Sequence, residues 1–204
     1  SIEVSTITST NDAGLWLIDP YNYFLSTSNL TTLDNNLVSS NITITTTGST
    51  SGSFSSTSFG FGHIVFQDNF TYDGAGNRTL TLTADGDIYL QDITSSSGAL
   101  TLDINATGNQ VYLDGDLSLN GGSIDIASTD VHFQKEGNQS ITTSGGSLAF
   151  NSTNLKLLQS GGTVSFNTGA GSLNLGSGTI GYTTTKQSIT APTLKLTSAG
   201  LNAR

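Results

Sequence analysis

The chain repeats with a period of 20 to 25 residues, and this repeat restricts the choice of fold more than any other feature. Residues 121–133, 145–157 and 170–182 each carry Gly-Ser followed by two pairs of apolar residues, with polar residues between. The residues predicted to be equivalent lie 20, 24, 24, 25 and 21 positions apart: Leu80, Leu100, Ile124, Leu148, Leu173 and Leu194. A period of this length is typical of a solenoid, in which every repeat forms one coil stacked on the next.

Within each repeat the apolar residues alternate with polar ones, as in short strands that bury one face. No segment combines apolar residues at helical spacing with strong helix formers, so we expect almost no helix. The leucine-rich-repeat pattern is missing, and the sequence therefore predicts an all-β parallel β-helix of about eight coils. The predicted inward pairs are Ile42/Ile44, Ile64/Phe66, Leu80/Leu82, Ile88/Leu90, Leu100/Leu102/Ile104, Val111/Leu113, Leu117/Leu119, Ile124/Ile126, Val131/Phe133, Leu148/Phe150, Leu155/Leu157, Val164/Phe166, Leu173/Leu175, Ile180/Tyr182 and Leu194/Leu196.

The repeat is less regular at the start of the chain. Residues 1–62 contain a cluster of aromatic residues and leucines, followed by a stretch rich in Ser, Thr and Gly at 46–58. We expect this stretch to be an exposed loop or a short, loosely packed coil. Residues 63–204 carry the regular repeats, and no linker separates the two parts, so we predict one continuous domain.

Composition excludes several classes of function. The chain has no cysteine, so disulfides, zinc–thiolate sites and iron–sulfur clusters are absent. Six Lys and Arg against a net charge of -9 leave too little positive charge for binding nucleic acid or anionic membranes. No apolar run approaches the roughly 18 residues of a membrane helix. No secretion signal opens the sequence, so we expect that any such signal has been removed.

Charge is distributed unevenly along the chain. Residues 1–130 hold 14 acids and one base, Arg78, whereas residues 131–204 hold one acid, Glu136, and five bases. The two parts therefore carry net charges of -13 and +4. This asymmetry is either drift on a solvated surface or complementarity between the two ends of the molecule.

The histidines and glutamates form no catalytic pattern. His63 and His132, the only two histidines, adjoin apolar strand positions and have no partner at useful spacing. We therefore assign both to the surface or to corners between strands, and Glu136 to a solvated turn. A polysaccharide lyase needs acids clustered with Lys or Arg, and the acid-rich part has a single base. We predict no catalytic residue.

Aspartate-rich turns are the one candidate for a bound ion. Asp85 and Asp87 flank one glycine, and Asp114 and Asp116 flank another. Such turns either serve as simple turn chemistry, which we favour, or supply oxygen ligands to calcium. No other cofactor is predicted. Stacked Thr-x-Thr pairs, which an ice-binding face needs on every coil, are replaced in the later repeats, and the seven Asn-x-Ser/Thr sequons are close to chance.

Three segments resemble a known family of secreted adhesins. Residues 14–23 (GLWLIDPYNY), 41–46 (NITITT) and 79–88 (TLTLTADGDI) are similar to the filamentous-haemagglutinin-like exoproteins of two-partner secretion systems. The resemblance covers 11–95. It implies a right-handed parallel β-helix, export from a Gram-negative bacterium to the cell surface or the medium, and roles in adhesion, aggregation or biofilm. The Asn-Pro-Asn-Gly and Asn-Pro-Asn-Leu motifs of the family's secretion domain are missing.

Two functional hypotheses follow. In the first, the chain is a monomeric stalk segment of a longer adhesin that contacts glycans or proteins on cell surfaces. In the second, it is an adhesive subunit that stacks head to tail into a filament, because solenoid ends expose unpaired strand edges. A carbohydrate-active enzyme is the weaker alternative. The residues predicted to mediate stacking alternate as in strands near the two ends: Ile2, Val4, Thr6, Leu194 and Leu196.

Overall fold

The computed structural model describes residues 16–18, 22–46, 62–158, 163–176, 179–182, 186–190 and 193–195. Side chains are described for 22–46, 62–158 and 163–176, and the strands outside these ranges are described by their backbone. Within these ranges, every regular element is a strand apart from one helix, α1 (Thr27–Leu37). The strands are β1 (Trp16–Ile18), β2 (Tyr23–Leu25), β3 (Ile42–Thr45), β4 (Ile64–Phe66), β5 (Phe70–Tyr72), β6 (Arg78–Thr83), β7 (Ile88–Leu90), β8 (Ile93–Ser95), β9 (Leu100–Leu113), β10 (Leu117–Ser118), β11 (Ile124–Phe133), β12 (Gln139–Thr142), β13 (Leu148–Leu157), β14 (Thr163–Asn167), β15 (Ser172–Asn174), β16 (Thr179–Tyr182), β17 (Lys186–Thr190) and β18 (Thr193–Lys195).

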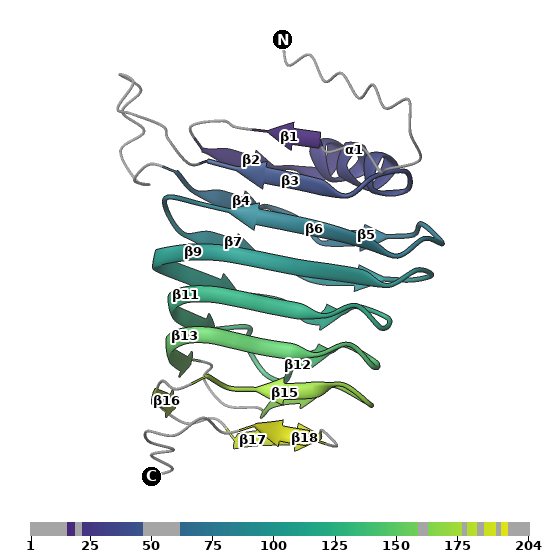
Figure 1. Ribbon diagram of the computed structural model, residues 1–204. Helices are drawn as coiled ribbons and strands as arrows, with labels where there is room; N and C mark the ends of the chain where they lie inside the picture. The colour runs from purple at the N-terminus through teal and green to yellow at the C-terminus, as the bar shows by residue number, and fades with distance from the viewer. Residues whose placement is uncertain are drawn as a thin grey trace.

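The strands form a β-solenoid whose coils stack along one axis in sequence order (Figure 1). All named strand pairs are parallel, and each joins a strand to its counterpart in a neighbouring coil. The front face is the column β1-β3-β6-β9-β11-β13-β15-β18, and the back face is the sheet β5-β8-β10-β12-β14-β17. A side face joins them, made by β2, β4, β7 and the second halves of β9, β11 and β13.

The structure shows about four turns of the solenoid. They run from β6 to β14, where each coil has its front, side and back strands and its side chains are described. The prediction of about eight coils exceeds this number. At the first coil the back strand is replaced by α1, and the next coil passes through residues 47–61, which lie outside the described part of the chain.

The register confirms most of the predicted equivalences and corrects one of them. Ile124 pairs with Leu148, and Leu148 pairs with Leu173. The counterpart of Ile124 in the preceding coil, however, is Leu102, which in turn pairs with Leu80. Leu100 instead lies opposite Arg78. The prediction that Leu100 is equivalent to Ile124 is therefore wrong by two residues. A two-residue error keeps the alternation of side chains, so both leucines still point inward.

Apolar side chains fill the interior, as the alternation predicts. All the predicted inward residues from Ile42 to Leu175 are buried, most of them with no exposed surface; Ile180, Tyr182, Leu194 and Leu196 lie outside the residues whose side chains are described. Three phenylalanines from two coils pack edge to face, with ring centroids 5.5 to 5.8 Å apart: Phe133, Phe150 and Phe166. Edge-to-face packing adds to the stabilisation that burial alone provides.

Glycines form a column at the corner between the back and front faces. A Cβ atom added to Gly98, Gly122, Gly146 or Gly171 would lie 1.9 to 2.2 Å from a backbone oxygen of the preceding coil. Only glycine lets two backbones approach this closely. The Thr168 hydroxyl, which lies inside the same corner, donates a hydrogen bond of 2.8 Å to the Gly171 carbonyl and so closes the turn.

Helix α1 is a feature that the sequence patterns did not predict. Its residues are mostly Ser, Thr and Asn, which favour caps and turns over helix interiors. Leu30, Leu33 and Leu37 recur at helical spacing, and all three are buried against the solenoid. Tertiary packing of this apolar stripe therefore determines the helix, as it does for most short helices.

Thr46 also departs from expectation. The stretch 46–58 is predicted to be an exposed loop or a loose coil, but Thr46 itself is fully buried, and its hydroxyl donates to the Gly62 carbonyl. Thr46 thus follows β3 directly and packs inside the solenoid. The rest of the stretch lies outside the described residues.

Candidate functional site

The predicted calcium ligands lie in turns, where they join one coil to the next. The side chain of Asp87 accepts a hydrogen bond of 3.0 Å from the Gln110 backbone N–H, and the side chain of Asp116 accepts one of 2.8 Å from the Ser140 N–H. Asp85 contributes its carbonyl to the Asn109 amide, while the Asp114 N–H donates to the Leu90 carbonyl. All four positions therefore serve inter-coil hydrogen bonding.

Two ladders of inter-coil hydrogen bonds run along the solenoid. One follows the corner where the back strands begin (the back corner), and the other follows the corner where the side strands begin (the side corner). On the back corner, the Asn69 side chain accepts from the Asp92 N–H and the Asp92 side chain accepts from the Asp116 N–H, at 3.3 and 2.7 Å. On the side corner, Asn22 accepts from the His63 N–H and the His63 Nδ1 atom accepts from the Asp87 N–H, at 2.8 and 2.9 Å. Each side chain satisfies a backbone donor where the strand begins.

A metal ion would have to compete with these contacts. The Lys135 ammonium lies 2.6 Å from one oxygen of Asp116 and 3.7 Å from Asp92, so a cation already occupies this corner. Burial lowers the pKa of Lys135, but the hydrogen bond and charge of Asp116 outweigh burial and leave it raised. Among the described residues, no three or more His, Cys, Asp or Glu side chains converge on a point that could hold a metal ion. Calcium binding by these turns stays an untested alternative to the simple turn chemistry that we favour.

The side face carries a cluster that sequence reasoning did not find. We call Tyr89, Tyr112, Asp130, His132 and Lys156 the side-face cluster. The rings of Tyr89 and Tyr112 stack at a centroid distance of 4.5 Å and an interplanar angle of 4°, and the His132 ring follows at 4.6 Å. Tyr89, Tyr112 and His132 occupy one register position in successive coils. An alignment of the repeats at this position would therefore have indicated the stack of rings.

Asp130 is the charged centre of the side-face cluster. Its carboxylate accepts a hydrogen bond from the Lys156 ammonium at 2.5 Å and another from the Asn154 amide at 2.6 Å. Burial raises the pKa of Asp130, but the hydrogen bonds from Lys156 and Asn154 outweigh burial and hold the pKa below its ordinary value. The carboxylate is therefore ionised at neutral pH and fully engaged.

His132 confirms the predicted outward direction but not an open surface position. It points away from the core on β11, yet only 8% of its surface is exposed, because Tyr112 and Lys156 cover it. Neither ring nitrogen has a hydrogen-bond partner among the described residues. Burial lowers the pKa of His132, and the charge of Lys156 lowers it further, against the opposing charge of Asp130. His63 is also largely buried, at a corner.

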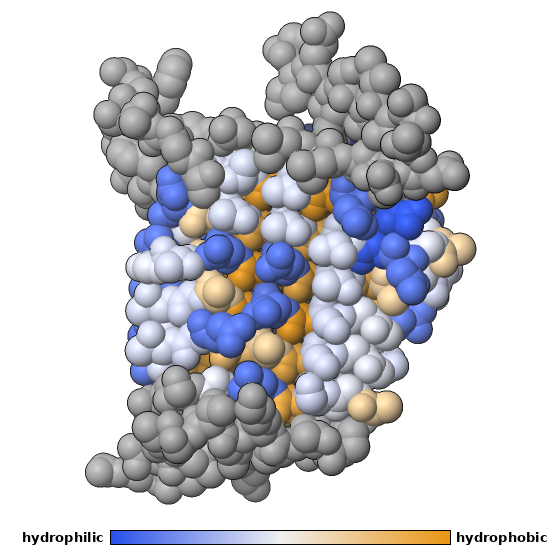
Figure 2. Space-filling view, in the orientation of Figure 1, coloured by the Kyte–Doolittle hydropathy of each residue, from blue (hydrophilic) through white to orange (hydrophobic). Residues whose placement is uncertain are grey.

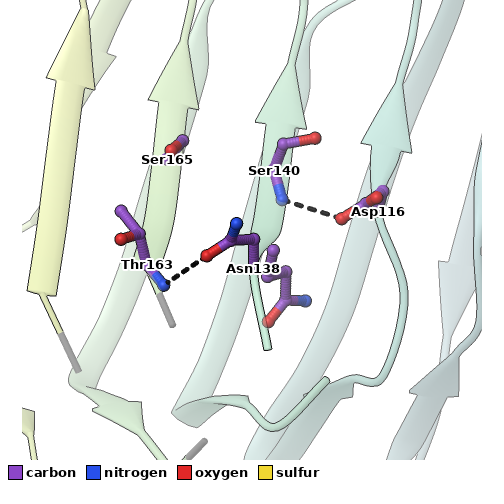
Figure 3. A pocket seen from close by; sticks show the side chains of 6 residues that line it. Asp116, Asn138, Ser140, Thr163 and Ser165 are labelled. Carbon is purple, nitrogen blue, oxygen red and sulfur yellow. Dashed lines mark hydrogen bonds between the residues drawn. The ribbon is translucent and has the colours of Figure 1, made fainter. Parts of the chain in front are cut away.

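The back face holds a shallow hollow of about 400 Å³ that is open to solvent (Figure 3). It is lined by polar side chains from three successive coils: Asp116, Asn138, Gln139, Ser140, Thr163 and Ser165. Asp116 is the single ionisable residue in this set, and both of its oxygens are engaged, by the Ser140 N–H and by Lys135. Asn138 accepts from the Thr163 N–H at 3.1 Å. The hollow therefore offers hydroxyl and amide groups but no free acid–base pair.

The front face presents a different surface. Figure 2 shows columns of hydrophilic and weakly hydrophobic side chains over strips of hydrophobic ones. One column contains Thr43, Thr81, Asp103, Asp125 and Ala149, which lie in register on successive strands. Short side chains in register make this face flat and repetitive at the strand spacing of about 4.8 Å.

The structure describes only one of the five residues predicted to mediate self-association, and only by its backbone. Leu194 lies on β18, where its backbone is in register with Leu173. Ile2, Val4, Thr6 and Leu196 lie outside the described residues. In the described ranges no helix is long and apolar enough to cross a membrane.

Comparison of the chain with protein-family models, with curated proteins and with solved structures gave no match.

Proposed function

We propose that this chain is a non-enzymatic structural and adhesive module of an extracellular protein, a right-handed solenoid of about eight coils that stacks head to tail. The observation that carries the proposal is the order of the coils. Because successive coils lie along one axis, the acid-rich residues 1–130 and the base-rich residues 131–204 follow one another along the stack. Unlike net charges toward the two ends of the stack favour a heterologous head-to-tail contact that propagates.

An adhesive role is supported by the filled interior. Apolar side chains occupy the centre of the described coils, so ligands have access to the outer faces and the ends. The flat front face presents short side chains, most of them polar, in register on successive coils, which suits multivalent contact with glycans or proteins of another surface. The resemblance of residues 14–23, 41–46 and 79–88 to filamentous-haemagglutinin-like exoproteins supports export from a Gram-negative bacterium and a place on its surface.

The test is the state of the purified chain across salt concentrations. We expect light scattering to show particles well above the 21.1 kDa of one chain at low salt, and electron microscopy to show filaments about as wide as one coil. Salt should shift the equilibrium toward single chains, because it screens the attraction between the ends. A single-chain mass at every concentration and salt level would refute the stacking.

The adhesive part of the proposal has its own measurement. Retention of the chain on immobilised glycans and on bacterial cells should fall when Asp125→Lys places a long cationic side chain in the middle of the flat front face. The matched control is Glu136→Lys, which makes the same change of charge in an exposed turn. Equal retention of both variants would contradict a role for the front face.

A further inference from the structure

Helix α1 occupies the place of a strand in the first coil. In the order β1, β2, α1 it follows the front and side strands, where each later coil has its back strand. The back sheet accordingly ends at β5, which pairs with β8 on one edge and has α1 packed near it on the other (Figure 1). A strand edge covered by a helix cannot accept another strand.

Contacts at both ends fasten α1 to the chain on either side of β5. At its N-terminus, the Asp68 carboxylate accepts hydrogen bonds from the Thr27 N–H at 2.9 Å and from the Thr27 hydroxyl at 2.7 Å. At its C-terminus, the Arg78 guanidinium donates to the Leu37 and Val38 carbonyls at 2.9 and 2.8 Å. An acid at the first turn and a base at the last turn both suit the helix dipole.

Arg78 has a special place in this arrangement. It is the only base among residues 1–130, and the structure uses it at the C-terminus of α1. Beneath the helix, Leu30, Leu33 and Leu37 supply the buried apolar face. Polar contacts at the two ends and apolar contacts between them make α1 a unit that docks as a whole.

One contact of α1 combines a hydrogen bond with a repulsion between like charges. Asp34 on α1 accepts a hydrogen bond from the Asp73 N–H at 3.2 Å, which brings the two carboxylates near each other. Burial raises the pKa of Asp34, the hydrogen bond from the Asp73 N–H lowers it, and the negative charge of Asp73 raises it, so that it lies above its ordinary value. At neutral pH the docked helix therefore carries a like-charge repulsion, which makes its release from the sheet easier.

The opposite edge of the same sheet is β17, the last strand of that sheet among the described residues. β17 begins at Lys186, whereas Asp68 and Asp73 flank β5. A parallel pair between β5 of one copy and β17 of another would continue the ladder of the back sheet and bring unlike charges to one corner.

We infer that α1 is a releasable cap, which hides a docking edge on β5 for the β17 strand of a second copy of this chain. The inference rests on the proposed head-to-tail stacking and states what controls it. Release of α1 opens the back sheet at the acidic end, and docking of α1 closes it.

The test compares two substitutions at one exposed position of the full chain. Thr32→Pro breaks α1 in its middle, while Thr32→Ala raises its helix propensity and serves as the matched control. The proline should shift the docking equilibrium on the order of a hundredfold toward the released helix. Hydrogen exchange at 27–37 should then accelerate, and light scattering should show larger particles at a lower protein concentration than for the control.

Further variants keep the result interpretable. Arg78→Gln removes the C-terminal contacts and replaces Thr32→Pro if that variant does not fold. Asp34→Asn keeps the acceptor for Asp73 but removes the repulsion, so it should slow exchange in α1 and weaken association. Lys186→Glu, added to Thr32→Pro, should reverse the gain in association.

Two outcomes would overturn the cap. The first is a released helix, shown by fast exchange at 27–37, in a chain that associates no more than the control. The second is full assembly of the unsubstituted chain while 27–37 remains protected, in which case stacking survives and the cap alone fails. If neither the unsubstituted chain nor the released variant assembles, stacking itself fails, and adhesion remains to be decided by its own assay.

Discussion

Substitution of one glycine should separate the role of close coil packing from that of backbone conformation. Gly146 belongs to the glycine column, and a Cβ atom there would lie 2.1 Å from the Gly122 oxygen and 2.4 Å from the Gly122 carbonyl carbon. Both are backbone atoms of the neighbouring coil, which cannot rotate away. In Gly146→Ala the two coils must therefore separate by more than 1 Å at this corner to reach an ordinary contact distance.

The cost follows from the hydrogen bonds that cross between these two coils beside Gly146. The Ile124 N–H donates to the Ser147 carbonyl at 2.8 Å, and the Ser147 N–H donates to the Ser123 hydroxyl at 3.0 Å. A separation of this size breaks both, at about 1 kcal/mol each, and loses apolar contact as well. We expect Gly146→Ala to lower the free energy of unfolding by about 3 kcal/mol.

Gly137→Ala is the matched control. Gly137 has a φ of 77°, but a Cβ atom there meets nothing within 4 Å. Its cost is the left-handed conformation alone, about 1 kcal/mol. Urea denaturation followed by circular dichroism measures both variants against the unsubstituted chain. If Gly146→Ala costs no more than Gly137→Ala, the coils are not packed as closely as the structure shows.

Three further predictions test the core, the side-face cluster and the aspartate corner. Phe150→Ala should lower the free energy of unfolding by about 3 to 5 kcal/mol in thermal denaturation, because it leaves a cavity between two rings. The pKa of His132 is lower in the folded chain than in the unfolded chain, so the unfolded chain takes up the proton at higher pH. The free energy of unfolding should therefore fall as pH drops below about 6.5. His132→Leu should flatten this dependence, as measured by denaturation at several pH values. Asp116→Asn should cost no more than about 1 kcal/mol, because its ion pair with Lys135 is partly exposed, and added calcium should leave the melting temperature of the unsubstituted chain unchanged.

The pH range in which His132 affects the free energy of unfolding differs from the range in which Asp130 affects it. The groups that face the His132 ring are Tyr112, Asp130 and Lys156, with the charge of Asp87 farther away. The lowered pKa of Asp130 also destabilises the fold in acid, but only as pH falls through the carboxylate range near 4 and below. A loss of stability between pH 6.5 and 5 therefore reports on His132.

The strands and the core could be predicted because a strand places alternate residues on opposite faces. Each apolar pair with one polar residue between, such as Leu80 and Leu82, determines its own inward face. The error at Leu100 has a physical origin in the same rule. Residues 107–109 of β9 occupy a place where β11 has Thr129 alone, so two extra residues enter without changing which face points inward. Alternation therefore does not detect an insertion of two residues.

The helix and the side-face cluster could not be predicted in the same way. The stripe of Leu30, Leu33 and Leu37 has helical spacing, but the residues between them are weak helix formers, and only the docking site makes the helix stable. The contact of Tyr112 with His132 depends on register between coils, which period alone gives to within a few residues.

The solenoid architecture also explains how a cap can be released while the rest of the molecule stays folded. Each coil contacts its neighbours only, so stability is close to a sum of coil and interface contributions, and opening at one end leaves distant coils unchanged. The polar contacts that fasten α1 involve Asp68, Asp73 and Arg78, all within residues 68–78, the segment that contains β5 and leads into β6. Undocking therefore breaks contacts at a single interface, whereas the hydrogen-bond ladder from β6 to β14 is untouched. A chain built this way can expose a strand edge for assembly at a cost confined to its first coil.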